Sequence, residues 1–369
     1  MGICSEAIDK RLGEEHDNNK GGSGESMLAR IYEVLALAIL VTLGPAAWAG
    51  PSLLFDVTNG AVLYAEDVDT PWHPASLTKM MTAYVTFVAV QDGTLALDTP
   101  IGCSKLANAQ GPTRLGLPVG ATITVETALQ ALIMKSANDV AVMLAEAVSG
   151  SHEAFVDYMN GMAGRLGMTR TKFANANGLP DGDQITTARD MGKLAAAIVR
   201  DFPQYAYMWA MREMRIGKRQ LRTHNGLLIH YPGADGMKTG FICDSGFNIV
   251  ASATRADHKL IAVVFGEATV QERGLRTANL LEHGFRTYAW KALFGTQTLE
   301  TMGIDEGAKR TVTKPAKVFS PVCGTGAGPV AQRKKGRALM AEGGAKAQQV
   351  KPRVHGTSMA KKNSPSPPW

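Results

Sequence analysis

Ser76 and Lys79 stand three residues apart in the stretch PASLTKMMTA, where a helix is expected to begin. Residues with this spacing lie on one face of a helix, so the lysine amine would lie beside the serine hydroxyl. A serine becomes a nucleophile when a base takes its proton, and a lysine is such a base only when it is neutral, as burial would make it. The pair is common by chance, so it needs support from the rest of the chain.

Two later stretches carry side chains that could complete such a site. KSANDV follows an apolar helix and supplies Ser136, a second hydroxyl for relaying a proton, and Asn138, whose amide could hold a substrate carbonyl or the lysine. GMKTGF opens a strand and supplies Lys238 and Thr239, a positive charge and a hydroxyl that suit a substrate carboxylate. Together the three stretches predict acyl transfer to Ser76.

Acyl transfer creates a negative charge on the substrate carbonyl oxygen, and a glycine and a backbone amide of this stretch could stabilise it. Gly240 has no side chain to block the approach of its strand to Ser76. The next amide, that of Phe241, can join the Ser76 amide in an oxyanion hole. Each residue has an ordinary alternative when taken singly, such as a serine that caps a helix. Taken together, they favour a catalytic cleft.

The three stretches also match a known signature. The motifs S-x-x-K, S-D-N and K-T-G mark penicillin-binding proteins and class A β-lactamases, and they occur here in that order, with S-A-N in the middle. Residues 51 to about 290 resemble the D-alanyl-D-alanine carboxypeptidases, low-molecular-mass penicillin-binding proteins of the serine DD-peptidase family. The blocks that carry the resemblance are PASLTKMMTAYV, SANDVAVMLAEAVSGS, FVDYMN, LGMTRTKFANANGL, TTARDM, HNGLL, PGADGMKTGF and GFNIVASATR.

The resemblance implies a role for each candidate residue. Ser76 would be the acylated nucleophile and Lys79 its general base, with Ser136 and Asn138 on the opposite wall of the cleft. The residues implied to bind substrate are Lys238, Thr239, Gly240, Phe241 and Arg273. For Arg273, an ordinary solvated arginine on a helix stays an open alternative.

The resemblance also implies what the site works on. The terminal D-alanine of peptidoglycan stem pentapeptides would be removed through a Ser76 acyl-enzyme, without cofactor or metal. β-Lactams would act as inhibitors by the same attack. The loop 177–179 falls near the cleft in this family, and no role is assigned to it here.

Three alternative functions stay open at this point. A class A β-lactamase would need a glutamate for the deacylating water between the second and third motifs, and residues 154–212 contain none. An endopeptidase that cuts D-Ala–diaminopimelate cross-links shares the motifs. A catalytically silent wall-binding protein would hold peptidoglycan in the cleft but would form no acyl adduct with penicillin.

The elements that must position these residues follow from the hydrophobic pattern. LLFDVTNGAVLYAED alternates on both sides of Asn59-Gly60, the preferred hairpin turn, and the strand pattern returns in GMKTGF, FNIVASATR and KLIAVVFGE. Helical spacing is predicted over 76–88, 125–134, 139–148, 153–166, 187–199 and 271–283. This order predicts an α/β (α+β) fold, DD-peptidase/β-lactamase-like, with an antiparallel sheet from both ends of the domain sandwiched between helical clusters.

Both ends of the chain differ from this predicted domain, residues 50–290. The first 26 residues are polar and without periodicity, and a signal peptide with an A-x-A cleavage site is expected from Met27 to Ala49. It predicts export to a periplasmic or wall-facing location. Residues 291–369 form a basic, low-complexity tail that is expected to be disordered.

Charge and cysteine content limit the partners further. The formal net charge is +6, but residues 291–369 alone carry fourteen Lys and Arg against four Asp and Glu, so the remainder is slightly acidic. The domain therefore gives no nucleic-acid signal, whereas the tail could contact an anionic wall polymer or membrane surface. The four cysteines lack metal-ligand spacing; Cys103 and Cys243 could pair, but sequence alone establishes no connectivity.

Overall fold

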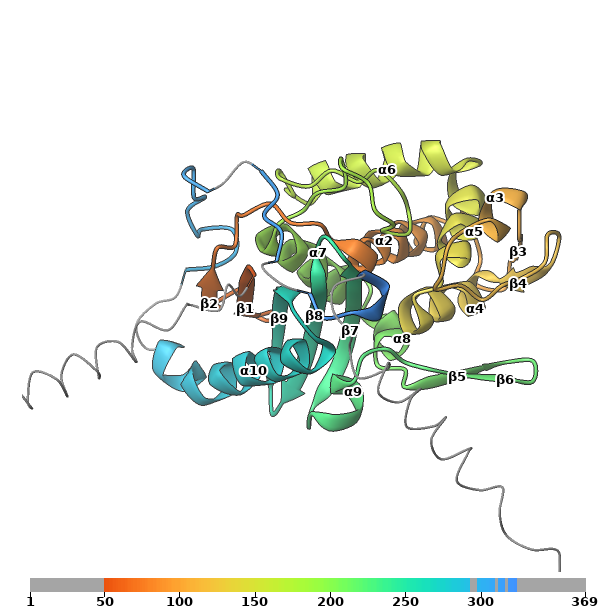
Figure 1. The fold of residues 1–369 in the computed structure, drawn as a ribbon. Helices are drawn as coiled ribbons and strands as arrows, with labels where there is room; N and C mark the ends of the chain where they lie inside the picture. The colour runs from red at the N-terminus through yellow and green to blue at the C-terminus, as the bar shows by residue number, and fades with distance from the viewer. Residues whose placement is uncertain (1–49, 293–296, 309–310, 316–317, 324–369) are drawn as a thin grey trace, which may run out of the picture. The chain divides into compact units, whose positions relative to one another are not determined.

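The computed structural model of the 369-residue chain describes residues 50–292, 297–308, 311–315 and 318–323 (Figure 1). The predicted leader and signal peptide, residues 1–49, and the predicted tail from residue 324 onward lie outside the described residues. Within the described part, no helix combines the length and the apolar character needed to cross a membrane.

Five antiparallel strands form the central sheet, in the spatial order β2-β1-β9-β8-β7. They are β1 (Ser52–Asp56), β2 (Val62–Glu66), β7 (Ala234–Ile242), β8 (Gly246–Arg255) and β9 (His258–Glu267). The first two form the predicted hairpin, and β1 then pairs with β9 from the other end of the domain, with Leu53 opposite Val263. The prediction of a sheet built from both ends is confirmed, and β7 is left as an edge strand.

Helices cover both faces of this sheet (Figure 1). The longer ones are α2 (Lys79–Gln91), α5 (Asn138–Ser149), α6 (His152–Arg165), α7 (Ala188–Asp201) and α10 (Val270–Ala292). The shorter helical segments are η1 (Ala75–Thr78), α3 (Lys105–Asn108), α4 (Val125–Gln130), η2 (Ala131–Lys135), η3 (Pro203–Tyr205), α8 (Ala206–Trp209), α9 (Leu227–His230) and η4 (Pro321–Cys323). Two small two-stranded sheets were not predicted: β3 (Pro100–Gly102) with β4 (Thr122–Thr124), and β5 (Glu213–Ile216) with β6 (Arg219–Arg222).

Alternating side chains divide the core into layers on the two sides of the sheet. Leu53 and Ile261 join the large cluster that includes the helices around α2, α5 and α7. Their chain neighbours Leu54 and Leu260 point the other way and pack with Leu281 of α10. Successive residues of a strand face opposite sides, so an apolar run buries both faces at once. The predicted sandwich is confirmed.

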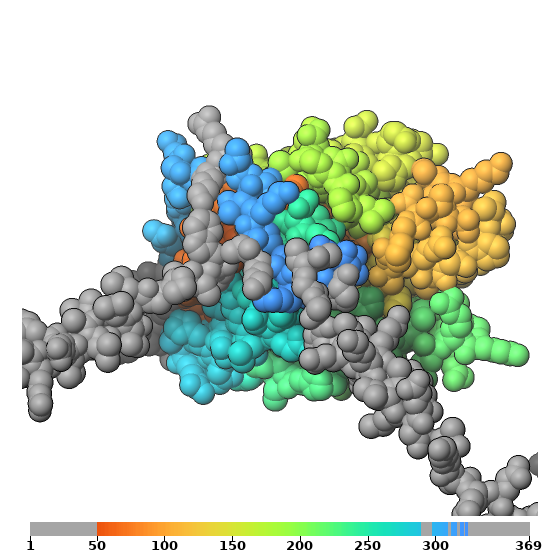
Figure 2. Space-filling model, in the orientation of Figure 1, coloured from red at the N-terminus to blue at the C-terminus, as the bar shows by residue number. Residues whose placement is uncertain are grey.

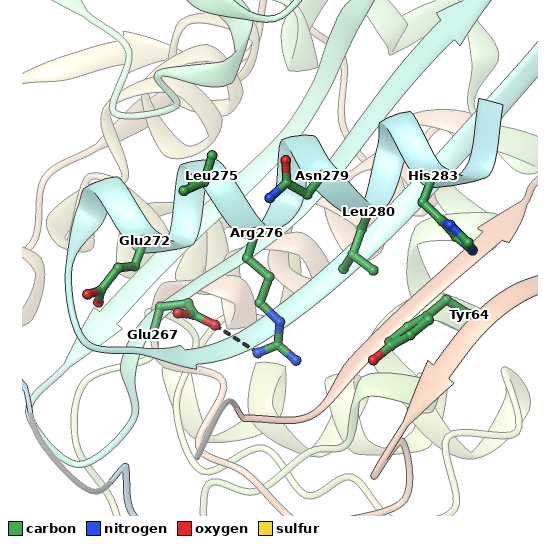
Figure 3. A pocket seen from close by; sticks show the side chains of 8 residues that line it. All are labelled: Tyr64, Glu267, Glu272, Leu275, Arg276, Asn279, Leu280 and His283. Atoms are coloured by element: carbon green, nitrogen blue, oxygen red, sulfur yellow. Dashed lines mark hydrogen bonds and ion pairs between the residues drawn. The ribbon is translucent and has the colours of Figure 1, made fainter. Parts of the chain in front are cut away.

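α10 is tied to the sheet by charged contacts as well as by its apolar face. Arg276 donates to Glu267 at the end of β9 (2.7 Å) and to Glu66 of β2 (2.8 Å). Figure 3 shows this side of the helix, where Tyr64 and Leu280 line a hollow of about 420 Å³ beside the ion pair. These contacts fix how the first two turns of α10 lie over the end of the sheet.

The helix predicted from residue 76 is in fact two segments, which corrects the sequence-based boundary. Ser76 lies in the 3-10 turn η1, and α2 begins only at Lys79. Residues i and i+3 eclipse one another in a 3-10 turn, so the pair still faces one way. Ala75 has a φ of +49°, a left-handed conformation that non-glycine residues adopt at a cost.

The described residues between 297 and 323, which we call the strap, correct the boundary predicted at residue 290. That boundary falls inside α10, and the strap packs back on the domain: Leu299 is 2% exposed and its amide donates to the Gly60 carbonyl (3.2 Å). The low-complexity composition predicted disorder here, because the segment has little hydrophobic periodicity of its own. Contacts with the rest of the domain order the strap instead.

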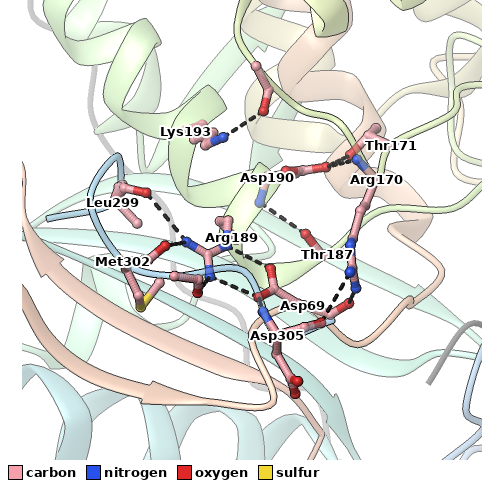
Figure 4. A network of polar contacts seen from close by, with 12 residues as sticks. Asp69, Arg170, Thr171, Thr187, Arg189, Asp190, Lys193, Leu299, Met302 and Asp305 are labelled. Atoms are coloured by element: carbon pink, nitrogen blue, oxygen red, sulfur yellow. Dashed lines mark hydrogen bonds and ion pairs between the residues drawn. The ribbon is translucent and has the colours of Figure 1, made fainter. Parts of the chain in front are cut away.

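The main partners of the strap are Arg189 and Asp69 (Figure 4). Arg189 donates to both carboxylate oxygens of Asp69 (2.6 and 2.8 Å) and to the carbonyls of Met302 and Gly303 (2.8 Å each). Asp69 also accepts the amide of Asp305 (3.0 Å). This buried cluster holds the first half of the strap.

A disulfide holds the other end of the strap. Cys243, just after β7, is bonded to Cys323 and not to Cys103, which is a buried thiol. Beside the disulfide, Lys314 pairs with Asp244 (2.9 Å). The suggested Cys103–Cys243 pairing is therefore wrong, because the actual partner lies in a segment that composition alone assigned to the tail.

Candidate active site

Ser76 lies where three segments of the chain meet. Gly240 of β7 packs against the turn η1: a β-carbon at this glycine would lie 2.9 Å from the Pro74 carbonyl oxygen and 3.2 Å from the Ser76 nitrogen. Gly178 meets the same turn at the Ala75 carbonyl, with a φ of +81° and no room for a side chain. Glycines at these two places let both backbones approach the serine.

Lys79 is fully buried directly beneath Ser76. Its amine is hydrogen-bonded to Ser76 Oγ (3.1 Å), Asn138 Oδ1 (2.7 Å) and the carbonyl of Asn177. Burial lowers the pKa of Lys79 well below its usual value, and the charge of Lys238 lowers it further. A neutral amine here donates to the two carbonyl oxygens and keeps its lone pair for the serine proton.

Ser136, which follows η2, and Asn138, the first residue of α5, line the same cleft. Ser136 has left-handed backbone angles (φ 61°, ψ 37°), and its buried hydroxyl has no hydrogen-bond partner among the described residues. Asn138 accepts from Lys79 through Oδ1 and donates through Nδ2 to the Gly111 carbonyl (3.0 Å). The asparagine is thus held in one orientation, while the serine hydroxyl is available to a ligand.

Two further cations lie where β7 meets the first turns of α10. Lys238 is buried and donates to the adjacent Thr239 carbonyl (3.0 Å), while Arg273 is buried with its Nε unpartnered among the described residues. Burial lowers the pKa of Lys238 to about 7, with a contribution from the charge of Arg273, whose own pKa burial lowers to about 10. Thr239 and Arg273 both face the cleft, so this end suits an anion.

His224 adds to this electrostatic environment and was not predicted as a site residue. Its Nε2 lies 3.1 Å from the amine of Lys135. Burial lowers the pKa of His224 to about 4, and the charges of Lys135, Lys238 and Arg273 act in the same direction. The ring is therefore neutral near pH 7 and can accept a hydrogen bond from Lys135.

The structure brings all nine predicted site residues together around one cleft of about 650 Å³. Seven of them line it: Ser76, Ser136, Asn138, Thr239, Gly240, Phe241 and Arg273. Lys79 and Lys238 lie just behind the walls. The sequence reasoning gave no role to the Asn177 carbonyl or to His224, although both residues lie in recognised blocks, and it placed Val322 in the predicted tail. Gly178 was inside a recognised block without a role.

The chemistry available is that of a hydroxyl, an amine and backbone amides. In the described ranges, no group of three or more His, Cys, Asp or Glu residues could hold a metal ion. A nucleophilic serine with a neutral lysine beside it suits acyl transfer.

Comparison with known proteins identifies relatives of this chain. The profile of the family described as D-alanyl-D-alanine carboxypeptidase matches residues 42–269. The chain is 33% identical over 274 residues to D-alanyl-D-alanine carboxypeptidase DacA of Haemophilus influenzae, over 73% of this chain and 70% of that protein. It is 37% identical over 251 residues to DacC of Escherichia coli, over 66% of this chain and 63% of that protein.

Solved structures show the same fold. Penicillin binding protein 5 from Haemophilus influenzae is 35% identical and superposes with a TM-score of 0.63, over 66% of this chain and 72% of that one. Penicillin-Binding Protein D2 from Listeria monocytogenes, in its ampicillin bound form, is 29% identical with a TM-score of 0.59, over 64% of this chain and 97% of that one.

Proposed function

Because the chain belongs to the D-alanyl-D-alanine carboxypeptidase family, we propose that Ser76 is the nucleophile that removes the terminal D-alanine from peptidoglycan stem pentapeptides. The observation that carries this assignment is the hydrogen bond between the Ser76 hydroxyl and the buried amine of Lys79 (3.1 Å). No other described contact of the cleft pairs a hydroxyl with a base of lowered pKa.

Acylation begins with a proton transfer along that hydrogen bond. Lys79 takes the hydroxyl proton while Ser76 Oγ bonds to the carbonyl carbon of the penultimate D-alanine. The developing oxyanion accepts from the backbone amides of Ser76 and Phe241, whose strand Gly240 holds against η1. The carbon–nitrogen bond then breaks, and the proton passes from Lys79 through Ser136 to the leaving amine.

Deacylation returns the enzyme to its starting state. Water attacks the ester carbon, its proton goes to the neutral Lys79, and the proton returns to Ser76 Oγ when the ester bond breaks. The products are free D-alanine and the shortened stem. Atoms and charges balance over the two steps without a cofactor.

The cationic end of the cleft gives the substrate its direction. Lys238, Thr239 and Arg273 bind the carboxylate of the terminal D-alanine, because a carboxylate is the partner that these buried cations lack. β-Lactams, which carry a carboxylate and an activated carbonyl, acylate the same serine. One relative of this chain has been solved with ampicillin bound.

The place of action follows from the substrate. A peptidoglycan-processing enzyme works outside the cytoplasmic membrane, in agreement with the signal peptide predicted for residues 27–49. The basic residues of the tail would add a weak contact with an anionic wall polymer or membrane surface.

The decisive experiment analyses products and adducts together. The wild-type protein should release one free D-alanine from each pentapeptide muropeptide and should become labelled by fluorescent penicillin. Ser76→Ala should lose both activities by at least about 10³-fold. Ser149→Ala, outside the cleft at the end of α5, should retain them. Split cross-linked dimers in place of free D-alanine would assign an endopeptidase instead, and no penicillin adduct would mean a silent wall-binding protein.

A further inference from the structure

The strap carries a part of the chain from the far side of the domain to the mouth of the cleft. After the Arg189–Asp69 cluster (Figure 4), the Phe319 amide donates to the Ala268 carbonyl (3.0 Å), at the corner between β9 and α10. The disulfide from Cys323 to Cys243 then closes the path. The described residues of the strap are the blue ones in Figure 2, some of which lie beside green atoms near the centre of the view. The last turn, η4, is thereby held beside the end of β7.

Val322, in this last turn, is part of the cleft wall. It lines the cleft together with Cys243 and Val270, and the residue is 81% exposed. Phe241 and Phe247 line the same region as a stacked pair with centroids 4.3 Å apart. These residues form an apolar rim that faces solvent, although water is a poor environment for so many apolar atoms in one place.

The direction of β7 decides which part of a substrate meets this rim. Lys238 and Thr239 lie on one side of the attack point at Gly240, and under the proposed function they hold the leaving D-alanine. The strand continues in the other direction through Phe241 to Cys243, about 10 Å past Gly240 at the usual rise of a strand. The acyl half of an extended substrate must run this way.

We propose that Val322 is a specificity-determining residue that contacts apolar groups on the acyl side of the substrate, two to three residues before the scissile bond. The Cys243–Cys323 bond keeps it in that position. This inference deepens the proposed function and rests on it. The ligand chemistry is an aliphatic or aromatic substituent on the stem peptide, or on the side chain of a β-lactam.

The test compares two peptides that differ only in their apolar substituent: L-lysyl-D-alanyl-D-alanine with acetyl or with octanoyl groups on its amines. The measured quantity is the ratio of kcat/KM for the octanoyl peptide to that for the acetyl peptide. Val322→Ala should lower this ratio about 3-fold and Val322→Asp about 10-fold, because apolar contacts of one or two carbons have effects of this size. Val119→Ala, at an exposed valine outside the cleft, is the matched control and should not change it.

An unchanged ratio in both Val322 variants would overturn the inference while leaving the proposed function intact. Wild-type protein that cleaves neither peptide would instead overturn the proposed function, so the two failures are distinguishable.

The holding role of the disulfide is tested separately. Cys323→Ser, and wild-type protein reduced with dithiothreitol, should both show a ratio about 10-fold below that of the oxidised wild type. If the ratio of kcat/KM values is the same as in the oxidised wild type after both changes, this part of the inference is overturned. If Cys323→Ser fails to fold, the Val322 variants, which keep the disulfide, still decide the main question.

Discussion

Two regions of this protein bury positive charge, and they treat it in opposite ways. Under the strap, Arg189 is bound by a bidentate carboxylate and by strap carbonyls. Around the cleft, the only hydrogen-bond partners of Lys79 and Lys238 in the described part of the chain are uncharged, and Arg273 Nε has no partner there. In the first region the charge of the cation is paired by protein groups. In the second region the cations have no charged partner and are available to bind a ligand.

The pKa shifts follow the same division. Burial would raise the pKa of Asp69, but the hydrogen bond and charge of Arg189, aided by the Asp305 amide, outweigh it and lower the value. In the cleft, burial lowers the pKa of both lysines; at Lys79 the charge of Asp139 acts in the opposite direction but does not outweigh it. A buried charge that is fully paired supports structure, while one left poorly paired points to function. Substitutions in the two regions should therefore affect different measurements.

The largest expected effect is on chemistry, in Lys79→Met. Without its base, acylation by penicillin should slow by about 10³–10⁴-fold, while the protein stays folded. Stopped-flow acylation and thermal melting measure the two properties. Lys172→Met removes an exposed lysine outside the cleft and is the control. Undiminished labelling of Lys79→Met would remove this lysine from the mechanism.

Arg189→Met should instead act on stability. It leaves the buried carboxylate of Asp69 unpaired, and breaking such a pair costs about 3–5 kcal/mol of the free energy of unfolding. Chemical denaturation measures this loss, and the remaining folded protein should acylate at the normal rate. Arg200→Met, which breaks an exposed pair with Asp201, should cost no more than about 1 kcal/mol. Equal losses in the two variants would contradict a structural role for the buried cluster.

Lys238→Met should weaken substrate capture and spare stability. Loss of a charged hydrogen-bond donor predicts a decrease of about 10²-fold in kcat/KM for a D-Ala-D-Ala peptide, mainly through KM. Its thermal midpoint should stay the same or rise, because an apolar side chain replaces a buried charge. A midpoint that falls as far as that of Arg189→Met would make Lys238 a structural residue.

The smallest expected effect is on pH dependence. In the proposed mechanism, acylation needs neutral Lys79 and carboxylate binding needs charged Lys238. The acylation rate should therefore fall when the pH drops through the lowered pKa of Lys79. Carboxylate capture needs charged Lys238, whose pKa is about 7, so kcat/KM should decline by up to about tenfold per pH unit above that value. In Lys238→Met the alkaline decline should disappear and the acid one remain. If kcat/KM of Lys238→Met still declines at alkaline pH as in the wild type, that decline belongs to the titration of another group.

Much of this arrangement could be predicted from local patterns. The i, i+3 spacing of Ser76 and Lys79 survives the change from helix to 3-10 turn, because both geometries bring such residues to one side. The alternation on both sides of Asn59-Gly60 predicted the hairpin of β1 and β2, and the order of strands and helices predicted helices on both faces of the sheet. Composition gave the wrong prediction for the strap. A low-complexity sequence shows that a segment has few apolar residues of its own, but it does not reveal distant partners such as Arg189.

By itself, then, the sequence predicted the strands of the central sheet and the longer helices, proposed the nucleophile and its base, and determined the class of reaction, since each depends on residue types at short spacing. Only the tertiary structure decided that the carbonyl of Asn177 meets Lys79, that Cys323 and not Cys103 bonds to Cys243, and that Val322 reaches the cleft. Those contacts join residues far apart along the chain. These contacts form because burial and packing bring distant parts of the chain together, and no local sequence pattern shows which distant residues will meet.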